Sequence, residues 1–155
     1  MVLTRQYKNE SIEIIFDCQD EADSNEPEED EEEEEKEEEE DEEAEAEEPE
    51  RGINFKVIIT KPTGEKMILQ CAAFDTLDIS GVRYVGSEKD IKDTTLYSGP
   101  VFEHLDDELR NAFFSYLEDR KINDEMCVFI NYYSAEKEQN EYAYWLRQLS
   151  TFTTE

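Results

Sequence analysis

The sequence reads INFKVIITKPTGEKMILQCA at residues 53–72, and this stretch decides the fold because it joins two apolar runs through a turn. Residues 53–59 and 67–72 are rich in β-branched and long apolar side chains, the composition typical of strands. Between them, Pro62 presets φ and Gly64 can adopt a positive φ, so the linking residues favour a tight turn. The stretch predicts a β-hairpin.

A second hairpin is predicted at the N-terminus. Residues 2–7 and 11–16 alternate apolar with polar side chains and are separated by a short polar segment. Weaker strand patterns follow at residues 78–85 and 93–97. We therefore expect about six or seven antiparallel strands.

From Pro100 onwards, the apolar spacing changes to three and four residues, which is typical of helices. A first helix should end near Arg120, and a second should begin near Asn123 or Asp124. The second helix carries a terminal stripe, formed by Tyr142, Trp145, Leu146, Leu149 and Phe152. Three earlier aromatic residues, Phe129, Tyr132 and Tyr133, fall about 140° out of phase with it, so we predict a kink or break near Ser134 and Ala135. Strands first and helices last indicate an α+β fold, with the C-terminal helices packed on the sheet.

The most unusual segment is an acidic tract at residues 26–50, where 20 acidic residues and one lysine give −19 of the total charge of −29. No apolar side chain larger than alanine occurs there, so the tract cannot form a core. We expect one domain over residues 1–155, with a disordered acidic insert at residues 20–50 between the second and third strands. The densest part of the tract is the candidate partner-binding site: Glu28, Glu29, Asp30, Glu31, Glu32, Glu33, Glu34, Glu35, Glu37, Glu38, Glu39, Glu40, Asp41, Glu42 and Glu43.

This charge restricts the classes of partner. Direct binding to nucleic acid or to anionic membranes is opposed, because both depend on protein cations. Basic proteins are the natural partners, because a dense row of carboxylates can compete for the lysine and arginine patches that bind nucleic acid. The simpler alternative is that the tract only keeps the protein soluble.

Other candidate sites are not supported by the sequence. The three cysteines, Cys18, Cys71 and Cys127, are far apart and form no metal-binding or disulfide pattern, so we expect reduced and mostly buried thiols. His104 is the only histidine, which excludes any site that needs two imidazoles. The solvated carboxylates share one environment, whereas acid–base catalysis needs two. We expect no catalytic residue, no metal and no cofactor, and no targeting signal is visible in this chain.

Four features together resemble the mitochondrial matrix acidic protein family, which includes the homologue that binds complement globular heads and hyaluronan. They are the terminal stripe, the apolar helix before Arg120 and Ile122, the hairpin from Phe55 to Cys71, and the acidic insert. The resemblance implies a highly twisted, seven-stranded antiparallel sheet in a doughnut-shaped homotrimer located in the mitochondrial matrix. It also implies that the terminal stripe packs against a helix or another subunit.

In that family, a further helix precedes the first strand and pairs with the last helix, whereas this chain opens on the first strand. We therefore expect the terminal stripe to be partly exposed here.

The resemblance implies a non-enzymatic adaptor or chaperone that binds basic RNA-binding or ribosomal proteins, without direct contact to nucleic acid and without membrane insertion. Through them it would affect mitochondrial RNA processing, including RNA editing, as well as translation and respiratory-chain maintenance. The alternative is a nonselective acidic shielding protein that resembles a histone chaperone.

Overall fold

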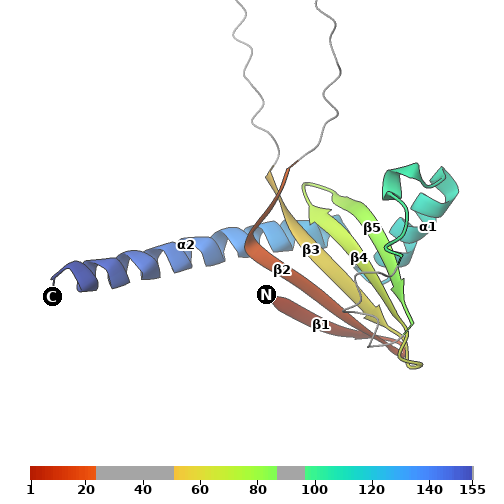
Figure 1. The fold of residues 1–155 in the computed structure, drawn as a ribbon, viewed down its shortest axis with the longest axis horizontal. Helices are drawn as coiled ribbons and strands as arrows, with labels where there is room; N and C mark the ends of the chain where they lie inside the picture. The colour runs from red at the N-terminus through yellow and green to blue at the C-terminus, as the bar shows by residue number, and fades with distance from the viewer. Residues whose placement is uncertain (24–50, 87–96, 155) are drawn as a thin grey trace, which may run out of the picture.

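The structure is a computed structural model, which describes residues 1–23, 51–86 and 97–154 (Figure 1). In these residues, five antiparallel strands form one twisted sheet in the order β1-β2-β3-β4-β5 (Figure 1). Two helices and one 3-10 turn follow. The elements are β1 (Val2–Tyr7), β2 (Glu10–Asp23), β3 (Arg51–Thr60), β4 (Lys66–Ala73), β5 (Leu77–Val85), η2 (Phe102–His104), α1 (Asp107–Glu118) and α2 (Asp124–Thr154).

Both predicted hairpins are confirmed. Strands β1 and β2 are joined by a two-residue turn, with Tyr7 paired to Glu10. Strands β3 and β4 are joined at residues 61–65, where Lys61 N–H donates to Glu65 O at 2.9 Å. Gly64 adopts a φ of 92°, which is the positive φ that the sequence predicted for this turn.

One face of the sheet forms the hydrophobic core. Each of the four longest strands alternates side chains between this face and the opposite one, as a strand with one buried face must. The buried side chains include Ile12, Ile14 and Phe16 of β2, Phe55, Val57 and Ile59 of β3, Leu69 and Cys71 of β4, and Leu77 and Ile79 of β5. The helices cover this face.

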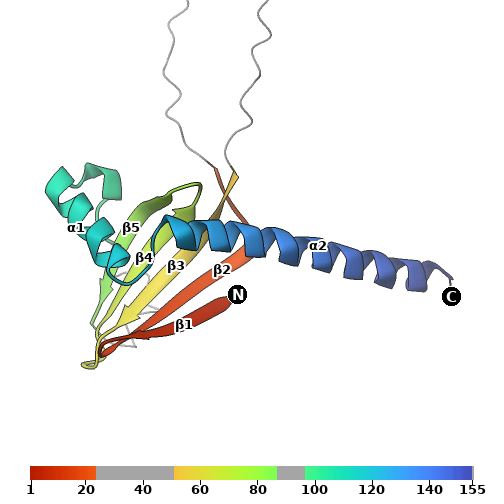
Figure 2. The ribbon, with the colours of Figure 1, turned by 180° about the vertical axis from the view of Figure 1, so that it is seen from behind.

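Helix α1 confirms the first predicted helix. The Asp106 carboxylate accepts a hydrogen bond from Leu109 N–H at 2.9 Å and so caps the helix N-terminus. The helix lies beside β5 (Figures 1 and 2) and buries Leu117 completely.

Helix α2 begins at Asp124, as expected, but the predicted kink or break near Ser134 and Ala135 is wrong, because one helix of 31 residues runs through both. Its first half packs on the sheet through Cys127, Ile130 and Ser134, whereas its second half extends beyond the sheet (Figure 2). Phe129 and Tyr132 are exposed, as the terminal stripe is, so the phase difference between the two aromatic sets requires no break in the helix.

The number of strands and the start of the acidic insert both differ from what the sequence led us to expect. The described sheet has five strands, whereas we expected six or seven; the expected strand at residues 93–97 falls almost wholly outside the described residues. Strand β2 continues to Asp23, so the expected start of the insert at residue 20 was wrong. Asp20 and Glu21 lie within this strand, and their charge had masked the strand pattern.

Candidate interaction surface: the acidic tract and the free half of helix α2

The acidic tract is attached to two neighbouring strands. Asp23 at the end of β2 and Arg51 at the start of β3 are Cα partners in the antiparallel register. The chain therefore leaves and re-enters the sheet at one place, between the second and third strands as expected. The candidate residues from Glu28 to Asp41, together with Glu42 and Glu43, lie outside the described residues.

The terminal stripe is exposed to solvent. The exposed fractions of Tyr142, Trp145 and Phe152 are 56%, 53% and 82%, and Leu146 and Leu149 are also exposed. The rings of Tyr142 and Trp145 stack on each other, with centroids 5.9 Å apart and planes inclined by 25°. The stripe thus does not cover the sheet of its own chain, although the resemblance implied a packing role for it.

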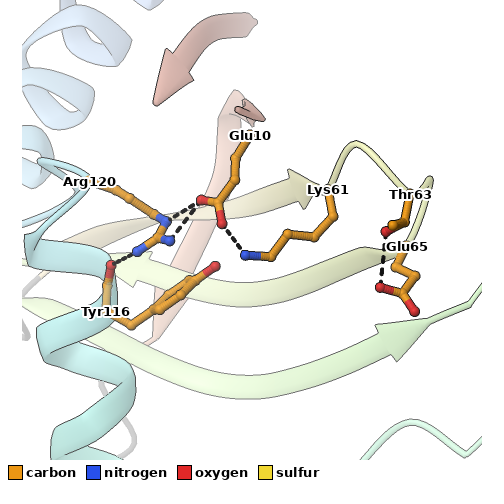
Figure 3. Close-up of polar contacts among 6 residues, drawn as sticks. All are labelled: Glu10, Lys61, Thr63, Glu65, Tyr116 and Arg120. Carbon is orange, nitrogen blue, oxygen red and sulfur yellow. Dashed lines mark hydrogen bonds and ion pairs between the residues drawn. The ribbon is translucent and has the colours of Figure 1, made fainter. Parts of the chain in front are cut away.

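The sequence did not foresee a buried cluster of charges at the other end of the molecule. The Glu10 carboxylate lies between Arg120 and Lys61 (Figure 3). Arg120 Nε donates to Glu10 Oε2 at 2.8 Å, and Arg120 Nη1 donates to the Tyr116 carbonyl at 2.7 Å. Its guanidinium also lies over the Tyr116 ring, 3.4 Å from the centroid. No local pattern could have revealed this cluster, because Glu10 and Arg120 are 110 residues apart.

The charge cluster anchors the fold. Burial by itself would raise the pKa of Glu10, but hydrogen bonds from Lys61 and Arg120 outweigh it and hold that pKa below its ordinary value. All acceptors and cations of the cluster are engaged with one another, and the cluster ties the end of α1 to the β1–β2 turn. We assign it to stability.

The cysteines lie mostly where the sequence suggested. Cys71 and Cys127 are buried and Cys18 is half-buried; all three are free thiols. Among the described residues, no group of three or more His, Cys, Asp or Glu side chains is arranged to hold a metal ion. Neither described helix has the length and hydrophobicity required to cross a bilayer.

A mostly apolar pocket of about 390 Å³ lies between α1 and the β3–β4 hairpin. Its lining includes Met67, Phe113 and Tyr84, whose hydroxyl donates to Glu65 Oε1 at 2.9 Å. The charged lining residues are of both signs, so this pocket indicates no particular ligand.

Comparison with known proteins identifies the class. Residues 1–153 match the mitochondrial glycoprotein family (MAM33). The chain is 33% identical over 104 residues to the mitochondrial acidic protein mam33 of Schizosaccharomyces pombe. The matched region covers 61% of this chain and 39% of that protein. It is also 30% identical over 106 residues to an uncharacterized mitochondrial protein of Arabidopsis thaliana. This matched region covers 66% of this chain and 42% of the Arabidopsis protein.

Two solved structures share the fold. A Leishmania major protein of unknown function, described as a sequence homologue of human p32, superposes with a TM-score of 0.72 at 24% identity, over 97% of this chain and 74% of that one. The Trypanosoma brucei p22 protein superposes with a TM-score of 0.72 at 22% identity and the same coverage.

The chain therefore belongs to the mitochondrial glycoprotein (MAM33) family, and the resemblance suggested by the sequence is confirmed. The expected mitochondrial location is confirmed with it, because the family and its named relatives are mitochondrial. The chain spans about two fifths of the length of the curated relatives that it matches.

Proposed function

We propose that this protein is a non-enzymatic adaptor or chaperone of the mitochondrial matrix that binds basic proteins through its acidic tract. The observation that carries the proposal is a charge of −19 in 25 residues whose two ends are anchored on paired strands. Its clients would be RNA-binding or ribosomal proteins, whose lysine and arginine patches carry the complementary charge. Through these clients it would affect RNA processing, including editing, translation and respiratory-chain maintenance.

The anchoring of the tract supports binding rather than simple solubility. A charged segment whose ends are fixed at one point stays near the folded domain, so any second contact on that domain acts at a high effective concentration. A segment that served only solubility would need no such arrangement.

We also propose that the protein assembles as a homotrimer, with the terminal stripe in contact with another helix or subunit. Five exposed apolar or aromatic side chains on one face of α2 support this: Tyr142, Trp145, Leu146, Leu149 and Phe152. Contiguous apolar surface of this kind commonly marks an interface.

The test replaces every Glu and Asp of residues 26–50 with Gln or Asn, which keeps the length and removes the charge. Binding of a fluorescent lysine-rich peptide is then measured by anisotropy over a range of salt concentrations. We expect weaker binding at low salt and a much flatter dependence of log Kd on log salt, because electrostatic attraction is screened. Unchanged affinity at low salt would remove the tract from the mechanism.

Competition separates an adaptor from a nonselective shielding protein. A basic client captured from mitochondrial extract is challenged with polylysine or histone at equal total charge. A selective adaptor retains its client, whereas a shielding protein exchanges it in proportion to charge.

A further inference from the structure

A groove lies between strand β2 and the second half of helix α2. Strand β2 pairs with β3 up to Phe16 and again from Glu21, and its pairing with β1 ends at Ile15, so residues 17–20 have no strand partner in the described register. Asp17, Cys18 and Gln19 form one wall of a cavity of about 680 Å³. One face of α2 forms the other wall. We call this cavity the β2–α2 groove.

The groove combines carboxylates with aromatic rings. Asp17, Glu138 and Glu141 line it, against a single lining lysine, Lys137. Tyr142 and Trp145 also line it, and their stacked rings remain more than half exposed. A negatively charged groove with flat aromatic surfaces is complementary to a cation that is itself planar.

We propose that the β2–α2 groove binds an arginine-bearing segment of a basic partner protein. This rests on the proposed function, because it names a second contact for the same class of partner. A guanidinium can stack on an aromatic face while it forms paired hydrogen bonds with a carboxylate, whereas an ammonium offers only a point charge. The groove should therefore prefer arginine to lysine more strongly than the acidic tract does, because the tract has carboxylates but no aromatic ring on which a guanidinium could stack.

The position of the groove favours cooperation with the tract. Asp23, the last residue of β2, is six residues beyond Asp17 of the groove wall. A partner held in the groove therefore lies close to the attachment point of the tract, and the two contacts reinforce each other as linked sites do. Tyr142 and Trp145 belong to both the groove and the terminal stripe, and this inference assigns these two rings to the partner. Leu146, Leu149 and Phe152 do not line the groove, so packing between subunits would use these three side chains.

Trp145 provides a direct readout, because it is the only tryptophan in the chain. The full chain is titrated with a tryptophan-free peptide of alternating arginine and alanine that carries a fluorescent label. Anisotropy reports total binding, and Trp145 emission reports occupancy of the groove. We expect the arginine peptide to change Trp145 emission at lower concentration than the matched lysine peptide does.

Two pairs of variants on the same helix make the test specific. Glu141→Gln and Tyr142→Ala alter the groove, whereas Glu136→Gln and Tyr132→Ala make the same changes outside it. Glu136 precedes Glu141 by five residues, about 140° around the helix, and Tyr132 is 71% exposed on the far side. We expect the groove variants combined to weaken arginine-peptide binding about five- to tenfold and the controls to change it less than twofold.

The outcomes separate this inference from the proposed function. Peptide binding that leaves Trp145 emission unchanged and is equally strong in all four variants would overturn the groove while leaving the tract in place. No binding at all would overturn the proposed function. If Tyr142→Ala changed the mass of the protein in solution without affecting peptide binding, the groove would belong to a contact between copies, and the inference would also be overturned.

Discussion

Arg120 and Glu10, 110 residues apart, form a buried ion pair in which Arg120 Nη2 lies 2.7 Å from Glu10 Oε2 (Figure 3). Their side chains are only 8% and 5% exposed. The pair joins the second residue after α1 to the first residue of β2, so it fixes the helical layer against the N-terminal hairpin. Because both charges are removed from water, replacing one partner leaves the other charge buried with less compensation, which destabilises the fold.

Arg120→Met should lower the free energy of unfolding by about 3 kcal/mol, because it leaves the Glu10 carboxylate buried with only Lys61 as its partner. Urea denaturation followed by circular dichroism measures the change. Arg110→Met is the matched control, since Arg110 pairs with the exposed Asp107 and should cost less than about 0.5 kcal/mol. Equal losses of unfolding free energy in the two variants would show that the buried Glu10–Arg120 pair stabilises the fold no more than an exposed pair does.

The same pair makes stability depend on pH on the acid side. Burial opposes ionisation of Glu10, yet the hydrogen bonds from Lys61 and Arg120 hold its pKa below the ordinary 4.5. The unfolded state therefore binds the proton more readily, and the contribution of Glu10 is present above pH 4.5 and lost as the pH falls through the lower folded pKa.

Wild type and Glu10→Gln should thus differ most in unfolding free energy near neutral pH and converge in acid. Urea titrations from pH 7 downwards measure this difference. Glu103→Gln removes an exposed carboxylate and is the control, with an expected change in unfolding free energy of less than about 0.5 kcal/mol. A gap between wild type and Glu10→Gln that stayed constant into acid would contradict the linkage.

The local patterns of the sequence predicted the hairpins and helix starts, because these depend on neighbouring residues. Alternation at residues 11–16 and the turn at Gly64 are examples. The Glu10–Arg120 pair could not be predicted, since nothing near either residue indicates the other. The β2–α2 groove was missed for a related reason: Asp17 and Glu141 line one cavity but lie far apart in the sequence.

The continuity of α2 shows the limit of periodicity. The phase difference between Phe129 and Tyr142 predicted a break on the assumption that both face the same surface. Phe129 instead stacks near Tyr133, with centroids 6.0 Å apart, while Tyr142 lies on the projecting half. Phe129 and Tyr142 are both exposed, and α2 contacts the sheet through Cys127, Ile130 and Ser134 instead, so the phase of the aromatic residues does not indicate the path of the helix.

The three cysteines should differ in reactivity. Cys18 is half-buried, whereas burial raises the pKa of Cys127 to about 12 and also raises that of Cys71. Thiolates are the reactive form, so a thiol reagent at pH 8 should label one thiol quickly in the folded protein and all three after denaturation. Cys18→Ser should remove the fast phase. A fast phase that persisted in Cys18→Ser would contradict this assignment.

Gly64 and Gly99 both have a positive φ but differ in the space around them. Gly64 and Gly99 have φ values of 92° and 90°, but a Cβ at Gly64 would meet no atom within 4 Å, whereas one at Gly99 would lie 2.4 Å from the Val82 carbonyl oxygen. Gly64→Ala should cost about 1 kcal/mol of stability, and Gly99→Ala about 3 kcal/mol. Thermal and urea unfolding measure both. Equal costs would mean that the contact with Val82 relaxes without penalty.

The proposed homotrimer makes a prediction about mass. Light scattering should give three times the 18.3 kDa of one chain at low and at high salt, because apolar packing of the terminal stripe is not screened by ions. Leu149→Glu should lower the mass by placing a charge in that contact, since an unpaired buried carboxylate is strongly unfavourable. Thr151→Glu, about 200° around the same helix, adds the same charge away from the stripe and should leave the mass unchanged. A wild-type monomer at both salt concentrations would contradict the trimer, and a trimer unaffected by Leu149→Glu would place its interface elsewhere than on the stripe.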